Sequence, residues 1–141
     1  LDPSAIITAL NLAGASVDFS GTGDRAAVRS ALANAGWPDG VAVRLGHSAV
    51  PGVQIIAEQL RAFGIRAEVT AADALALLDR LNDGSIQIAL IAWTSADERQ
   101  SWVNAVGETN VIDLFSVPIS YIATEGLSIT FTPGGWPLAE Q

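Results

Sequence analysis

The stretch "LRAFGIRAEVT", Leu60 to Thr70, joins the end of one predicted helix to the start of a predicted strand. Gly64 suits the position after the last helical residue, because glycine adopts a left-handed backbone at little cost. Beyond it Ile65, Ala67 and Val69 alternate with polar residues, which is the pattern of a half-buried strand. The stretch therefore predicts a helix that returns directly into a sheet.

Two other apolar stretches place this turn in a larger unit. "VAVRLG", Val41 to Gly46, alternates like a strand, and "IQIALIAW", Ile86 to Trp93, is the most continuously apolar stretch, which favours a central place in the sheet. Helices are predicted between the strands, over residues 51–63 and 71–84. The order strand, helix, strand, helix, strand predicts an α/β fold in which helices flank a βαβαβ, mostly parallel sheet.

Helix signals extend this prediction along the chain. Asp2 and Asp24 stand where N-caps are expected, each before an apolar-periodic segment. In the helix after the second strand, Leu75, Leu78 and Leu81 are expected to point inward.

The 141 residues are the size of one domain. We expect a helix and loop over residues 1–23, the α/β core over 24–93, and a variable loop with returning extended strands over 94–141. The whole of 1–141 is expected to be a single domain with a periplasmic-binding-protein-like, single-lobe architecture.

Composition excludes several function classes. The net charge is −8 and all seven basic residues are arginine, so a nucleic-acid binder is not expected. Without lysine there is no Schiff-base chemistry, and without cysteine there are no disulfides, thiol nucleophiles or thiolate-bound metals. The absence of cysteine fits an extracytoplasmic protein. No cofactor is expected.

Residues 24–45, "DRAAVRSALANAGWPDGVAVRL", and 56–93, "IAEQLRAFGIRAEVTAADALALLDRLNDGSIQIALIAW", carry an ordered series of motifs. Together with "VIDLFSVPISYIAT" near the end, the series resembles the C-terminal lobe of family 5 extracellular solute-binding proteins. These are the oligopeptide, dipeptide and nickel receptors of ABC importers. The positions that carry the resemblance are Asp24, Val28, Ala31, Leu32, Ala35, Gly36, Trp37, Ala57, Leu60, Gly64, Ile65 and Leu78 through Trp93.

Three positions depart from the family pattern. Gln87 stands in place of the usual aspartate, and Asp113 replaces a proline. Ala96 stands where peptide-binding members carry an aspartate that can hold the peptide's α-amine, with Asp97 displaced by one residue.

The resemblance implies one lobe of the substrate-binding component of an ABC transporter, which closes on a peptide or other small polar solute and is not an enzyme. Its implied partners are the N-terminal lobe of the same parent protein, the ligand and an ABC permease. Membrane contact is implied only through an upstream lipid anchor, with an extracytoplasmic location. The alternative is a solute-binding-protein-like lipoprotein domain with a regulatory or protein-interaction role.

Ligands of open parallel sheets bind beyond the carboxyl ends of the strands. The residues expected there, and predicted to bind ligand, are His47, Ser48, Trp93, Thr94, Ser95 and Asp97. Three of them have a structural alternative: Trp93 as a core-edge residue, Asp97 as a helix cap, and His47 as a surface or structural histidine. Because His47 is the single histidine and no nucleophile–base motif adjoins it, no catalytic or metal site is predicted.

Overall fold

The computed structural model describes residues 2–11, 15–17, 24–48, 50–116, 128–131 and 137–140. At its centre lies a parallel sheet of three strands in the order β3 (Ile65–Ala71), β2 (Val41–His47), β4 (Ile88–Leu90). Leu45 of β2 lies opposite Val69 of β3 and Ile88 of β4. The chain is therefore an α/β protein with the predicted βαβαβ core.

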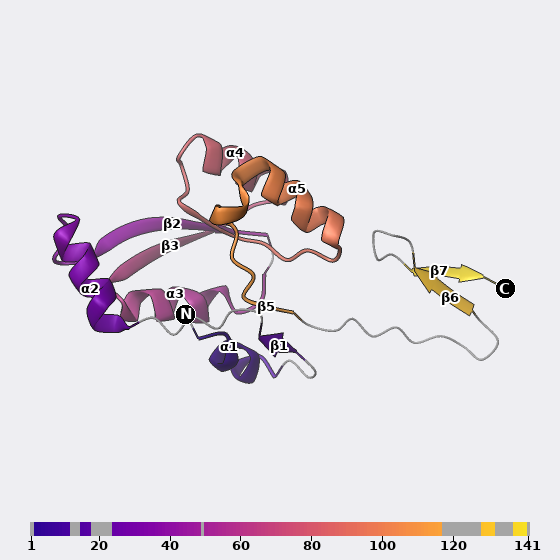
Figure 1. Ribbon diagram of the computed structural model, residues 1–141, viewed down its shortest axis with the longest axis horizontal. Helices are drawn as coiled ribbons and strands as arrows, with labels where there is room; N and C mark the ends of the chain where they lie inside the picture. Colours follow the sequence, from indigo (N-terminus) through magenta and orange to yellow (C-terminus); the bar gives the residue numbers. More distant parts are fainter. Residues whose placement is uncertain are drawn as a thin grey trace.

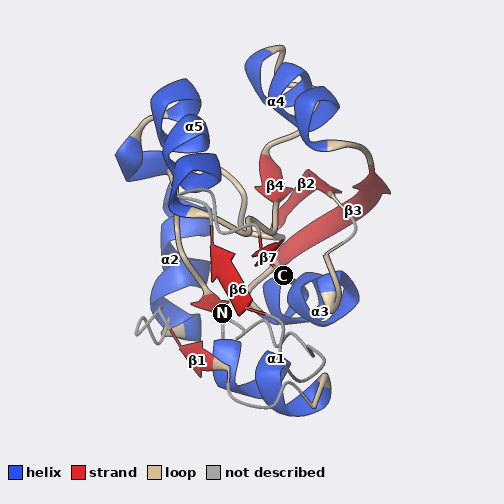
Figure 2. Cartoon of the chain, turned by 90° about the vertical axis from the view of Figure 1, so that its right-hand side faces the viewer, coloured by secondary structure: helices blue, strands red, loops and turns tan. Residues whose placement is uncertain are grey.

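Helices cover both faces of this sheet. Helix α3 (Val53–Ala62) lies against one face, and helix α4 (Ala74–Asn82) lies on the opposite side (Figures 1 and 2). Leu45 is fully buried on the α3 face in a cluster with Val53 and Ile56. Such an apolar layer between a helix and a sheet is the main stabilising element of the fold.

Gly46, the next residue of β2, faces α4. A Cβ atom at this position would overlap the Leu77 side chain and lie 2.9 Å from Ile86. Leu77 is completely buried in this space. The glycine therefore allows α4 to approach the centre of the sheet closely.

Two helices precede the sheet in the chain. Asp2 caps α1 (Pro3–Ala9) and Asp24 caps α2 (Arg25–Asn34), both as predicted. Ile6 of α1 is fully buried and belongs to the same cluster as Leu45. The Gln59 amide of α3 donates to the Asp2 carbonyl and accepts from the Asp2 backbone, which joins α1 to α3.

The prediction that Ile86–Trp93 forms the central strand is wrong. Among the described residues β4 spans only Ile88–Leu90 and pairs with β2 alone, whereas β2 pairs on both sides. The Gln87 side chain extends this edge, because its Oε1 accepts from the Arg44 N–H at 2.9 Å. The apolar character of β4 reflects helices on both faces and not a central position.

The inward face of α4 also differs from the prediction. Leu75 is 78% exposed, and Leu77 is the residue that α4 buries completely. Leu78 and Leu81 are half-buried, so two of the three predicted positions lie near the buried face of the helix. The phase of the helix is set by Leu77 inserting opposite Gly46.

After β4 the chain forms α5 (Ala96–Val106), a 3₁₀ turn η1 (Glu108–Asn110) and β5 (Phe115–Ser116). Strand β5 pairs antiparallel with β1 (Ser16–Val17), within a segment that we expected to be loop. Strands β6 (Ser128–Phe131) and β7 (Pro137–Glu140) form an antiparallel pair within the range 94–141, where returning extended strands were expected. Residues 117–127 of that range lie outside the described residues.

In the described ranges, every helix is too short or too polar to cross a bilayer.

Candidate ligand-binding site

Hydrogen bonds between Glu98 and the two residues before α5 cap the start of this helix, at the carboxyl edge of the sheet. The Ser95 hydroxyl caps the helix by accepting from the Glu98 N–H at 3.2 Å. Glu98 Oε2 accepts in turn from the Thr94 N–H at 2.6 Å and from the Thr94 hydroxyl at 3.1 Å. This arrangement resembles a capping box displaced by one residue, and it satisfies donors that the helix leaves free.

A shallow pocket of about 210 Å³ opens beside this cap. The indoles of Trp93 and Trp102, both half-buried, line it together with Glu98 and Ser101 of α5. The remaining lining is apolar and comes from Ala74, Ile91 and Ala92. We call this site the tryptophan pocket. It lies where α/β proteins place ligands, beyond the last residue of a parallel strand and at the first turns of two helices.

The structure assigns the polar side chains of the predicted site to the cap. Thr94 and Ser95 bond to Glu98. Asp97 is exposed in the first turn of α5, and the predicted alternative that it caps the helix is wrong because Ser95 is the N-cap. Of the four predicted residues after β4, only Trp93 lines the tryptophan pocket.

His47 and Ser48 lie at the carboxyl end of β2. The Ser48 N–H donates to the Leu90 carbonyl at 3.1 Å, which holds this end of β2 beside the chain that leads to Trp93. Alternation along the strand points His47 to the same face as Leu45, toward α3, whereas the tryptophan pocket includes α4 and α5 residues. His47 Nδ1 is buried without a hydrogen-bond partner among the described residues. His47 and Trp93, from the two halves of the predicted site, therefore lie on different faces of the sheet.

Sequence reasoning missed Trp102, Glu98 and Ser101 as site residues. Residues four positions apart lie on the same helix face, so Glu98 and Trp102 are neighbours once α5 is recognised. The signal available was the spacing from Ser95 to Glu98, which is the signature of a capping box and fixes where the helix begins.

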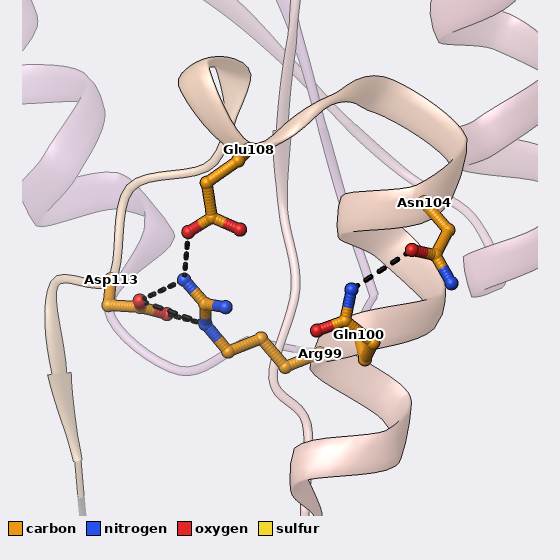
Figure 3. Close-up of polar contacts among 5 residues, drawn as sticks. All are labelled: Arg99, Gln100, Asn104, Glu108 and Asp113. Atoms are coloured by element: carbon orange, nitrogen blue, oxygen red, sulfur yellow. Dashed lines mark hydrogen bonds and ion pairs between the residues drawn. The ribbon is translucent and has the colours of Figure 1, made fainter.

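Next to Glu98 in α5, Arg99 joins this helix to the segment that leads to β5. Its Nε donates to both oxygens of Asp113 at 3.1 and 3.0 Å, and its Nη2 lies 2.8 Å from Asp113 and 3.0 Å from Glu108 (Figure 3). Hydrogen bonds to Asp113 and then Glu108 raise the pKa of the Arg99 guanidinium further above its ordinary value. The aspartate at the family's proline position thus has a structural partner in this chain.

Breaking this ion pair should lower stability. Because Asp113 binds the guanidinium through two oxygens, we expect Arg99→Gln and Asp113→Asn each to lower the urea midpoint of unfolding, and the double variant to lower it by less than the sum. The control is Arg44→Gln, whose nearest carboxylate, Glu68, lies 3.9 Å away with both side chains exposed. Equal effects of Arg99→Gln and Arg44→Gln would contradict the assignment.

Within the described ranges, no group of three or more histidine, aspartate or glutamate side chains is placed to hold a metal ion. Comparison with known proteins leaves the family open, because no family model and no curated protein matches this chain.

Proposed function

We propose that this chain is a ligand-binding lobe of the substrate-binding component of an ABC transporter, which holds a peptide or other small polar solute by lobe closure. The observation that carries the proposal is the tryptophan pocket at the carboxyl edge of a parallel sheet. Two indoles at the rim of an open pocket suit a surface that a second lobe covers on closure. The resemblance of the motif series to family 5 solute-binding proteins supports the transporter assignment.

The proposed function is the binding of a solute without its chemical conversion. Its partners are the N-terminal lobe of the same parent protein and an ABC permease, and its location is extracytoplasmic, with membrane contact only through an upstream lipid anchor if the parent protein carries one. One lobe contributes only part of the ligand contacts, so weak binding by this chain alone is consistent with it.

A second candidate is a lipoprotein domain that keeps the lobe fold for a regulatory or protein-interaction role. One observation favours it: the Thr94 and Ser95 side chains are engaged by Glu98, which leaves fewer polar groups for a solute. A partner protein that binds this chain while no small solute does would favour this candidate.

A thermal-shift screen with dipeptides, longer peptides, sugars and divalent metals tests binding at the pocket. A ligand at a hundredfold excess over its dissociation constant stabilises a protein by about 2.7 kcal/mol, which is readily measured. Ser101→Phe, which fills the pocket from an exposed position on α5, should abolish the shift. Ser30→Phe is the matched control, the same change at an exposed position on α2.

A ligand that stabilises both variants equally would show that it binds elsewhere. If no solute shifts the wild-type chain, the solute-binding proposal fails for this lobe. Recovery of a bound ligand in chemically altered form would contradict the non-enzymatic assignment.

A further inference from the structure

The lining of the tryptophan pocket combines groups that favour one chemical class. Trp93 and Trp102 supply aromatic surface, and the rest of the apolar lining comes from Ile91, Ala92 and Ala74. Among the residues that the structure describes, Glu98 is the single charged one that lines it. An aromatic, apolar site with one carboxylate at its edge complements a cation that carries alkyl groups, because the face of an indole ring attracts positive charge.

The charged side chains around the pocket disfavour an anion, and they oppose the positive N-terminal ends of α4 and α5. Asp73 caps α4 immediately before Ala74, and Asp97 lies in the first turn of α5 beside Glu98. Arg99, the neighbouring base, is engaged by Asp113 and so offers no free positive charge to the pocket. The chain as a whole carries a net charge of −8, which also attracts cations.

The hydrogen bonds of Glu98 narrow the class further. Both bonds from Thr94 end on Oε2, so Oε1 accepts none within the described part of the chain. The Ser101 hydroxyl donates to the Asp97 carbonyl at 2.9 Å, so its hydrogen is already used. Glu98 Oε1 and the Ser101 oxygen can each still accept a hydrogen bond, whereas neither side chain has a hydrogen left to donate, so the pocket suits a cation and not an anion.

We infer that the tryptophan pocket binds a compact alkylammonium group against Trp93 and Trp102, with Glu98 as its counter-ion. This inference rests on the proposed binding function of the same pocket and names the ligand class. A volume of about 210 Å³ is adequate for a head group of this size, with the remainder of a larger solute lying outside.

Calorimetric titration of the 141-residue chain with two isosteric probes tests the inference. Choline carries a trimethylammonium group, and 3,3-dimethylbutan-1-ol has the same shape without the charge. We expect choline to bind about tenfold more tightly than the alcohol, since cation–π and carboxylate contacts act only on the charged probe. Equal binding of choline and the alcohol would overturn the inference.

Variants test whether choline binds at the tryptophan pocket. Glu98→Gln removes the charge but retains an oxygen for the Thr94 bonds, and it should weaken choline binding about threefold while leaving the alcohol unaffected. Trp102→Leu should weaken choline binding about tenfold. Trp37→Leu is the control, an indole outside this pocket that is 51% exposed, and it should bind choline as wild type does.

The outcomes separate the two proposals. Unchanged choline binding in Glu98→Gln and Ser101→Phe would overturn the cation site even if Trp102→Leu did not fold. If a peptide or sugar protects the chain and Ser101→Phe abolishes that protection while choline does not bind, the solute-binding proposal stands and only the ligand class is wrong.

Discussion

Replacing Leu45 by alanine should lower the free energy of unfolding by about 3 to 5 kcal/mol, the range measured for fully buried leucines. Leu45 is completely buried in the central strand, where it packs against Val53 and Ile56 of α3. Truncation leaves a cavity between a helix and a strand that are both held by other contacts, so little collapse is expected. Urea unfolding followed by far-UV circular dichroism measures the change.

The matched control is Leu75→Ala, the same truncation at a leucine that is 78% exposed on α4. Its effect should stay within about 0.5 kcal/mol, as for most surface substitutions. If the two variants lost similar stability, the assignment of the core to the interface of β2 with α3 would be wrong.

Gly40→Ala should have the second large effect, a loss of about 2 to 3 kcal/mol, from two terms that add. Gly40 has a φ of +89°, where a residue with a side chain costs roughly 1 to 2 kcal/mol. A Cβ atom would also overlap the carbonyl oxygen of Gly64, which accepts from the Val41 N–H at 2.9 Å. The backbone that starts β2 beside β3 must then shift, with loss of that hydrogen bond, about 1 kcal/mol.

Gly36→Ala separates these terms. Gly36 has nearly the same φ, +92°, but a Cβ there would meet no atom within 4 Å. Only the conformational cost of about 1 to 2 kcal/mol is expected. Measured by the same urea unfolding, a Gly40→Ala loss no greater than the Gly36→Ala loss would mean that the close approach to Gly64 carries no energetic weight.

The core of the fold was predictable because its signals are local. Gly64 does have the positive φ, +91°, expected of a residue that ends a helix, and β3 begins at the next residue. Alternation in β2 and β3 likewise identified both strands. Strand order was not predictable in this way, because it depends on the side of β2 to which each helical connection returns. A continuously apolar strand such as β4 can lie at the edge of a sheet when helices cover both faces of that sheet.

The error in the predicted inward face of α4 also arises because a contact from another part of the chain decides the outcome. A three-residue spacing selects Leu75, Leu78 and Leu81, but a small rotation that brings Leu77 inward fits the same sequence almost as well. Gly46, which lies in β2 and not in α4, leaves the space that Leu77 fills, and this contact decides which face of α4 points inward. Trp93 was identified as a site candidate by its place after a strand, and its ligand-binding role stays a prediction.

Glu98 has two tasks, since it holds the first turn of α5 through Thr94 and also forms one wall of the tryptophan pocket. A substitution of Glu98 is therefore expected to change both the helix cap and the wall of the pocket. A laboratory redesign of the pocket has more freedom at Ala74, which lines the same space and makes no side-chain hydrogen bond to that turn.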